Sequence, residues 1–78
     1  MSQQIVLYTT LGCHLCEQAD TLVRQVMPME WDLVHVDVAE DDALLEKYGE
    51  RIPVIVINGQ ELAWPFGLLE LQAAIYAG

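Results

Sequence analysis

The sequence predicts an α/β domain built on a mixed four-stranded sheet, and three observations carry this prediction. Segments of strand length alternate with segments whose apolar residues recur at helical spacing. The third strand segment is followed by Asn58-Gly59, a strong short hairpin signal. The last segment is again helical. The expected order is β-α-β-α-β-β-α, a three-layer arrangement in which two parallel strands precede an antiparallel hairpin and helices cover both faces of the sheet.

Composition limits the class of protein and its partners. The 78 residues predict a single domain over residues 1–78, and 54% hydrophobic with 19% charged residues indicate a compact globular chain. The longest apolar run, Ile52 to Ile57, is interrupted by Pro53 and is far shorter than the ~18 residues of a membrane span. Twelve acidic against three basic residues give a net charge of −9, which repels phosphate backbones and anionic lipid. We therefore expect neither nucleic-acid nor membrane partners, and the acidic surface serves either solubility or docking to a basic partner.

The first strand and helix follow from the pattern of apolar residues. Ile5–Tyr8 is apolar without alternation, as expected for a central strand covered on both faces. An amphipathic helix of about three turns should follow, and it should end near Met27 because Pro28 disfavours helical geometry in the residue before it. The apolar stripe of this helix consists of Leu15, Cys16, Ala19, Leu22, Val23 and Val26.

The second strand and helix are predicted from alternation and capping. Successive residues of Trp31 to Val38 fall on alternate faces, which indicates a strand. We expect it near the edge of the sheet because one face carries polar groups. The two faces are Asp32, Val34, Val36 and Val38, and Trp31, Leu33, His35 and Asp37. His35 on this strand is interpreted as a hydrogen-bonded structural histidine. The acidic run around Asp41 offers an N-cap for the next helix, and Gly49 supplies its C-terminal stop.

The C-terminal third is predicted to form the hairpin and the closing helix. Val54–Ile57 and Gln60–Ala63 are its two strands. Pro65 suits the first turn of the last helix, and Trp64 and Phe66 are expected to pack against that helix rather than to form a rim beside the cysteines. The inward stripe of the helix is expected to be Leu68, Leu71 and Ile75.

The two cysteines of the chain, Cys13 and Cys16, lie three residues apart at the first strand-to-helix junction. If a helix begins near Cys13, its sulfur faces the unbonded backbone N–H groups of the first turn and the positive end of the helix dipole. Both favour a thiolate. Cys16 lies one turn further on the apolar stripe, within bonding reach. The arrangement predicts thiol-disulfide exchange with Cys13 as the accessible nucleophile and Cys16 as the resolving thiol.

The surroundings of Cys13 should lower the pKa of its thiol below the ordinary value of about 8.5. The helix terminus and a protonated His14 favour the anion, whereas the carboxylate of Glu17 opposes it. The N-terminal residues 1–4 contain no basic segment and no apolar signal core, so we expect a cytoplasmic protein. In that reducing compartment a permanent disulfide is not expected.

The chain as a whole resembles the thioredoxin fold, and it looks most like a small glutaredoxin-like protein. The resemblance is carried by the C-x-x-C pair after the first strand, by Ile52-Pro53 before the third strand, and by the order of elements. It implies that Pro53 is cis and stands beside Cys13, and that the backbone of Ile52 pairs with an extended substrate. It also implies glutathione as a possible co-substrate and no tightly bound cofactor.

The chain departs from the patterns of both related families. Glutaredoxins commonly read Tyr-Thr-Lys-Pro-x-Cys-Pro-Tyr-Cys; this chain keeps Tyr8, Thr9 and both cysteines but differs at Thr10, Leu11, His14 and Leu15. The Gly-Gly-acid segment that receives the γ-glutamyl end of glutathione is replaced by residues 63–66, Ala-Trp-Pro-Phe. Leu7 stands where thioredoxins have a buried acid. The substrate of neither family can therefore be assigned directly to this chain.

Four residues are candidate substrate contacts: His14, Arg51, Ile52 and Pro53. His14 either tunes the thiols or moves protons, and Arg51 either binds a substrate carboxylate or is a plain surface charge. The expected substrate is a protein or small-molecule disulfide, and the expected state is a monomer.

Three other interpretations of the cysteine pair remain open. The thiols could be structural and buried, or the chain could be a docking module of thioredoxin fold without turnover. They could also hold zinc or a cluster, with His14 and His35 as the remaining nearby ligands or with a second chain sharing the site.

Overall fold

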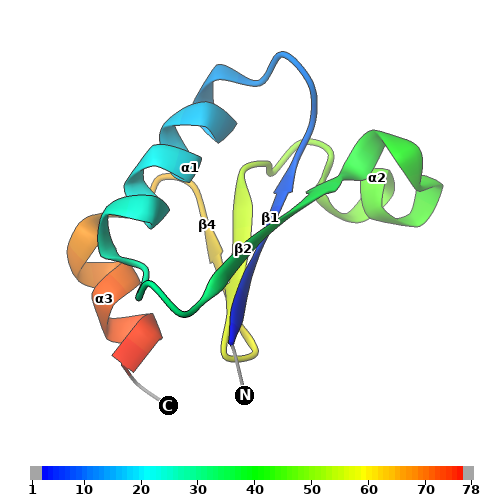
Figure 1. The fold of residues 1–78 in the computed structure, drawn as a ribbon. Helices are drawn as coiled ribbons and strands as arrows, with labels where there is room; N and C mark the ends of the chain where they lie inside the picture. Colours follow the sequence, from blue (N-terminus) through cyan, green and yellow to red (C-terminus); the bar gives the residue numbers. More distant parts are fainter. Residues whose placement is uncertain (1–2, 77–78) are drawn as a thin grey trace.

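The computed structural model describes residues 3–76, and these residues form the predicted order of strands and helices (Figure 1). A short 3-10 turn, η1 (Val38–Glu40), was not predicted from the sequence. The elements are β1 (Gln4–Thr9), α1 (His14–Val26), β2 (Asp32–Asp37), α2 (Asp42–Tyr48), β3 (Val54–Ile57), β4 (Gln60–Ala63) and α3 (Leu68–Tyr76).

The four strands form one mixed sheet in the order β2-β1-β3-β4. Strand β1 pairs in parallel with β2, from Gln4 opposite Asp32 to Thr9 opposite Asp37. On its other side β1 pairs antiparallel with β3, and β3 pairs antiparallel with β4. The predicted mixed sheet, the central position of the first strand and the edge position of the second are all confirmed.

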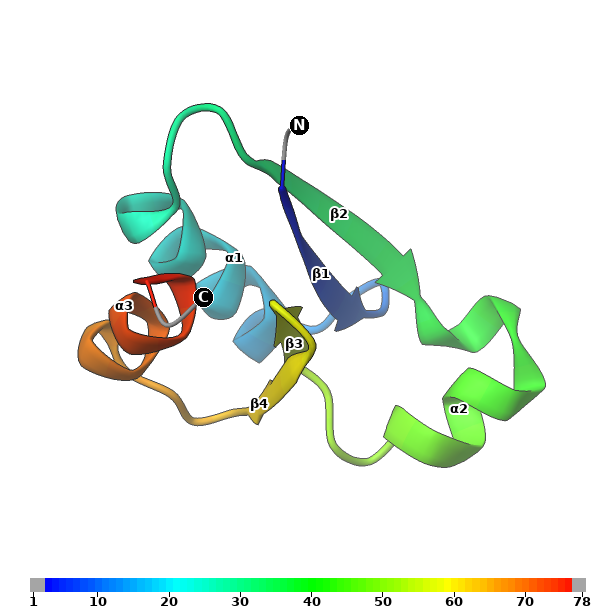
Figure 2. The ribbon, with the colours of Figure 1, turned by 90° about the horizontal axis from the view of Figure 1, so that it is seen from below.

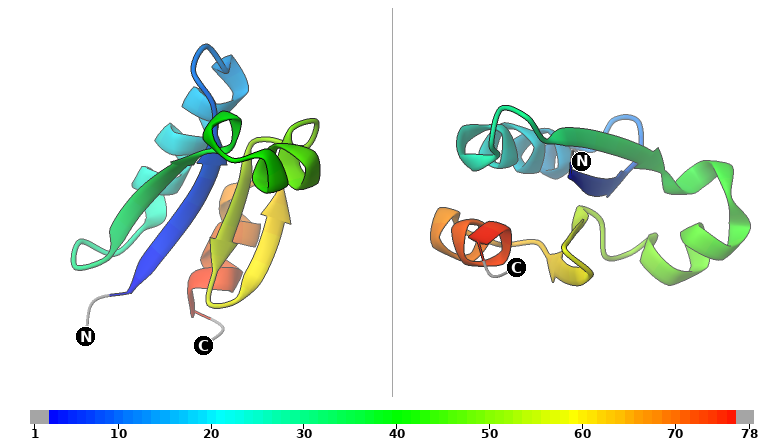
Figure 3. Two further views of the ribbon diagram at one scale, coloured as in Figure 1. Left: turned by 90° about the vertical axis from the view of Figure 1, so that its right-hand side faces the viewer. Right: turned by 60° about the horizontal axis from the view of Figure 1, so that its bottom comes forward.

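Helices α1 and α3 lie together on one face of the sheet, whereas α2 lies on the other side (Figures 1 and 2). Figure 3 shows the same layers from the side and from below. The main core fills the space between the sheet and the helix pair and consists of Ile5, Leu7, Ala19, Val23, Ile55, Ile57, Phe66, Leu71, Ala74 and Ile75. A smaller cluster beside α2 consists of Val38, Tyr48 and Val54, with Tyr8, Leu44 and Ile52 packed against it.

Helix α1 begins and ends where the sequence predicts. Cys13 is its N-cap, and the N–H of Met27 closes the last turn by donating to the Val23 carbonyl at 2.9 Å. The buried positions are Cys16, Ala19 and Val23. Leu15, which was assigned to the apolar stripe, is instead 45% exposed, because the buried side of the first turn is occupied by Cys16 and Ala19.

The predicted cap of α2 and the predicted hairpin turn are both found in the structure. Asp41 caps α2, and its carboxylate accepts N–H bonds from Ala43 and Leu44 at 2.9 and 3.2 Å. Asn58 and Gly59 both have positive φ, 51° and 79°, as a tight hairpin of this kind requires. The Asn58 amide also donates to the Ala74 carbonyl at 3.1 Å, which attaches the hairpin turn to α3.

Two predictions about the last helix are wrong. Pro65 lies in the connection and not in the first turn, because α3 begins at Leu68 with the Gly67 carbonyl accepting the Leu71 N–H at 3.0 Å. Leu68 is 40% exposed and does not belong to the inward stripe. Phe66, in the connection between β4 and α3, is buried instead of Leu68. Because its ring enters the core, the helix begins later in the sequence than predicted. The expected packing of Trp64 and Phe66 is confirmed.

No helix among residues 3–76 has both the length and the apolar character needed to cross a membrane.

A polar group on the α2 side of the sheet contributes to stability through ionised Glu61. The Tyr48 hydroxyl donates to its carboxylate at 2.6 Å, and Lys47 and Arg51 lie 3.8 and 3.7 Å from its oxygens. The hydrogen bond from Tyr48 has the largest effect and lowers the pKa of Glu61. Burial opposes it, the charges of Lys47 and Arg51 add to it, and the net pKa lies below the ordinary value of 4.5. The same bond to Glu61 raises the pKa of Tyr48 above 10.0.

We predict that Glu61→Gln lowers the melting temperature more at about pH 7 than at about pH 3. A depressed folded-state pKa contributes stability that is present above the unfolded value and is lost as the pH falls through the folded value. Thermal unfolding followed by circular dichroism at both pH values measures the difference. Glu46→Gln is the matched control, because Glu46 is exposed on α2; an equal loss for Glu61→Gln at the two pH values would contradict the prediction.

Candidate active site

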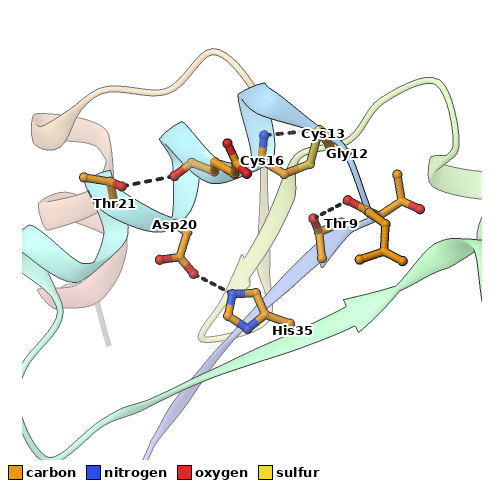
Figure 4. Close-up of a pocket in the computed structure, with 10 residues that line it drawn as sticks. Thr9, Gly12, Cys13, Cys16, Asp20, Thr21 and His35 are labelled. Atoms are coloured by element: carbon orange, nitrogen blue, oxygen red, sulfur yellow. Dashed lines mark hydrogen bonds and ion pairs between the residues drawn. A yellow bond between two sulfur atoms is a disulfide. The ribbon is translucent and has the colours of Figure 1, made fainter.

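The two cysteines lie where β1 passes into α1, and they are joined by a disulfide (Figure 4). Their Cα atoms are 5.2 Å apart, within the usual range for a bridged pair. The chain turns between strand and helix through Gly12, whose φ of +78° favours glycine at this position. Cys13 then takes the N-cap position, and its Sγ accepts the backbone N–H of Cys16 at 3.2 Å. The predicted placement of the pair at a helix N-terminus is thus found in the structure.

The two sulfur-bearing residues differ in burial. Cys16 is 3% exposed, whereas Cys13 is only partly buried. A molecule that approaches from solvent therefore has easier access to Cys13. This difference has the direction that the sequence predicts for a nucleophile and a resolving thiol, although the chemical roles themselves stay predictions.

A cleft of about 380 Å³ opens beside the disulfide. Its walls come from the loop between β1 and α1, from one side of α1 and from β2 (Figure 4). The lining residues are Thr9, Thr10, Leu11, Gly12, Cys13, Cys16, Glu17, Asp20, Thr21 and His35. Both sulfur-bearing residues thus face a space with several hydroxyl and carboxylate groups, and Leu11 in the loop is 92% exposed.

Asp20 and His35 form a polar pair across the cleft. The Asp20 carboxylate is hydrogen-bonded to His35 Nε2 and accepts from Arg24 Nε at 2.6 Å. Partial burial raises the pKa of Asp20, but the hydrogen bonds and charges of Arg24 and His35 lower it more, so the net pKa lies below the ordinary value of 3.8. The interpretation of His35 as a hydrogen-bonded histidine is confirmed.

Sequence reasoning missed Asp20 as a residue of the site. Asp20 is polar and lies outside the predicted apolar stripe of the helix, yet it contacts His35 of β2 and lines the cleft. The available signal was its spacing, because Asp20 stands four residues after Cys16 and seven after Cys13, which places all three on one side of the helix. The partner His35 could not be identified without the parallel pairing of β1 with β2.

None of the four predicted substrate contacts lines the cleft. His14 is 90% exposed at its side chain, and its Nδ1 lies 3.5 Å from the Glu17 carboxylate. Arg51 lies 3.7 Å from Glu61 and over the ring of Tyr48. The structure therefore joins Arg51 to the polar group beside α2 and leaves His14 on the surface of the first helical turn.

Ile52 and Pro53 lie at the end of the sheet where the cysteine loop begins. The peptide bond between them is cis, and Pro53 is buried. Val54 pairs with Tyr8, so the antiparallel register carries Pro53 toward the level of Thr9. The Ile52 N–H already donates to the Tyr48 carbonyl at 3.0 Å. An extended substrate that used this N–H would have to compete with that bond.

The residues that the structure describes do not bring together a set of side chains able to hold a metal ion. Within residues 3–76, no three side chains of the His, Cys, Asp and Glu types converge as a metal ion would require. His14 contacts Glu17 and His35 contacts Asp20.

Comparison with known proteins adds a family and a solved structure. A family model described as "Glutaredoxin-like domain (DUF836)" matches residues 4–76. The X-ray structure of Northeast Structural Genomics target protein XcR50 from X. campestris is similar, with 36% sequence identity and a TM-score of 0.81 over 95% of this chain and 97% of that chain. No curated protein matches.

Proposed function

This chain belongs to the glutaredoxin-like domain family (DUF836), and from this membership we propose that it is a thiol-disulfide oxidoreductase that works through Cys13 and Cys16. One observation carries the proposal. A partly exposed sulfur caps the first helix and is bonded to a sulfur that is 3% exposed. This is the geometry that a nucleophile with an internal resolving thiol needs.

The helix terminus supports the first chemical step. In the reduced protein the Cys13 thiolate would keep the backbone N–H of Cys16 as a donor and would lie at the positive end of α1. Both interactions favour the anion over the thiol. Glu17 in the first turn acts in the opposite direction, so we expect a moderate lowering of the thiol pKa.

The reaction proceeds by two exchanges. The Cys13 thiolate attacks one sulfur of the substrate disulfide; the first substrate thiolate leaves and takes up a proton, and a mixed disulfide remains on Cys13. Cys16 loses its proton and attacks the Cys13 sulfur; the second substrate thiolate leaves and is protonated, and the Cys13–Cys16 disulfide forms. Two electrons pass from the dithiol to the substrate. A cellular thiol reductant would return them, being oxidised to its own disulfide.

The two remaining contact candidates have supporting roles in this proposal. Pro53 forms part of the surface against which the substrate lies, and the backbone carbonyl of Ile52 accepts a hydrogen bond from an extended substrate chain. We propose the cytoplasm as the compartment, because a reducing pool is needed to reopen the disulfide after each turnover.

The test is a disulfide-reduction assay with wild type, Cys13→Ser and Cys16→Ser, supplied with a thiol reductant. We expect turnover by the wild type and only the uncatalysed rate with Cys13→Ser, because a serine hydroxyl cannot replace the thiolate. Ala73→Ser is a control at an exposed position of α3 and should keep full activity. Activity that survives in both cysteine variants would refute the proposal.

A further inference from the structure

We propose that Glu17 makes this site select polypeptide disulfides flanked by cationic residues and disfavour anionic thiol compounds such as glutathione disulfide. The inference rests on the proposed function and specifies its substrate class. It follows from the charges that surround the cleft and from the contacts that those charges already make.

Glu17 is the carboxylate that a bound substrate would meet. It lies in the first turn of α1 and lines the cleft, and its N–H donates to the Cys13 carbonyl at 3.2 Å. Its side chain is 77% exposed and lies 3.5 Å from His14 Nδ1. Asp20 differs, because the permanent charge of Arg24 offsets that of its carboxylate, which also contacts His35. His14 beside Glu17 is charged only when it is protonated.

The cations of the chain are engaged elsewhere. The sequence contains three lysine and arginine residues, and each lies beside a carboxylate: Arg24 is 2.6 Å from Asp20, and Lys47 and Arg51 are 3.8 and 3.7 Å from Glu61. The lining of the cleft includes none of them. A substrate carboxylate that entered the cleft would therefore face Glu17 without a lysine or arginine to receive it.

A cationic side chain close to the substrate disulfide would instead be attracted by the Glu17 carboxylate. Bound at Cys13, such a chain brings its lysine or arginine near Glu17, one helical turn away, and the net charge of −9 attracts it from a distance. Leu11, in the loop before Cys13, offers an exposed apolar surface to a polypeptide backbone or side chain. The charge complementarity thus favours a polypeptide over a small anionic disulfide.

The size of the effect follows from Coulomb's law. One unit charge about 7 Å away in water changes a rate about threefold, and exchanging a cation for an anion changes it up to about tenfold at low ionic strength.

The experiment compares two synthetic peptide disulfides that differ only in the residues flanking the cysteine, lysines in one and glutamates in the other. Single-turnover reduction by the reduced protein is measured at low and at high salt. We expect the lysine peptide to react up to about tenfold faster at low salt, with the ratio collapsing at high salt. Glu17→Gln should bring the ratio to within about twofold of unity. Using the ratio cancels any change that the substitution makes in the Cys13 thiol itself.

Glu46→Gln is the matched control, because it removes the same charge from an exposed position on α2, on the other side of the sheet. It should leave the ratio unchanged. Equal rates for both peptides, a faster glutamate peptide, or an equal response to Glu17→Gln and Glu46→Gln would overturn the inference while leaving the oxidoreductase standing. If the reduced wild type reduces neither peptide, the proposed function fails as well.

Discussion

Cys16→Ser should stop the reaction at a covalent complex in which the substrate stays bonded to Cys13. The first exchange needs only the thiolate of Cys13, which is the partly exposed residue of the pair. The second exchange needs the sulfur at position 16, which lies at the buried end of the disulfide. Without it the mixed disulfide has no internal attacker and must wait for a thiol from solution.

Mass spectrometry of the reduced variant mixed with a peptide disulfide measures this outcome. We expect one peptide per protein in Cys16→Ser, released by added reductant and located at Cys13. The reciprocal variant, Cys13→Ser, is the control and should collect little adduct, because the remaining thiol is 3% exposed in the parent structure. A larger adduct on Cys13→Ser than on Cys16→Ser would reverse the two roles.

The second large effect is expected in the core. Leu71→Ala removes a side chain with no exposed surface from the cluster between α3 and the sheet. Such a truncation costs about 2–5 kcal/mol, whereas a chain of this length is expected to have a total stability of only about 4–12 kcal/mol. The substitution should therefore remove a large part of the stability and, at the upper end of its cost, leave much of the protein unfolded at room temperature.

Leu69→Ala is the matched control for this prediction. It makes the same substitution in the same helix, but Leu69 is 81% exposed. Its effect should stay within about 0.5 kcal/mol. Urea unfolding of the two variants measures the difference. Equal losses would mean that α3 is not held to the sheet by the side chains that the structure places there.

Most of the fold could be predicted because its signals are local. The break at Pro28, the cap at Asp41 and the turn at Asn58-Gly59 each depend on residues that are near in the sequence, and each is found where it was expected. The start of α3 was predicted wrongly for the opposite reason. Phe66 is drawn into a core made by distant residues, and that burial outweighs the local preference of Pro65 for a first helical turn.

Of the site, the sequence predicted the cysteines and the nearby carboxylate of Glu17. The position of the cysteines at a helix N-terminus follows from the strand before them and the helical pattern after them. The pairing of Asp20 with His35 depends on which strand lies beside β1, and the pairing of Arg51 with Glu61 depends on where β4 returns. These contacts between distant residues decide which charges remain available at the cleft, so the composition of the cleft could not be read from spacing alone.

The rates at which the two thiols of the reduced protein are alkylated test the assignment of roles most directly. Brief treatment with iodoacetamide at about neutral pH, followed by peptide mapping, reports each site separately. We expect Cys13 to be modified first, with a rate that rises along a titration curve centred below the ordinary cysteine pKa of about 8.5. Modification of Cys16 at the same rate or faster, or two thiols that stay inert in the folded protein, would contradict the reactive sulfur at the start of α1.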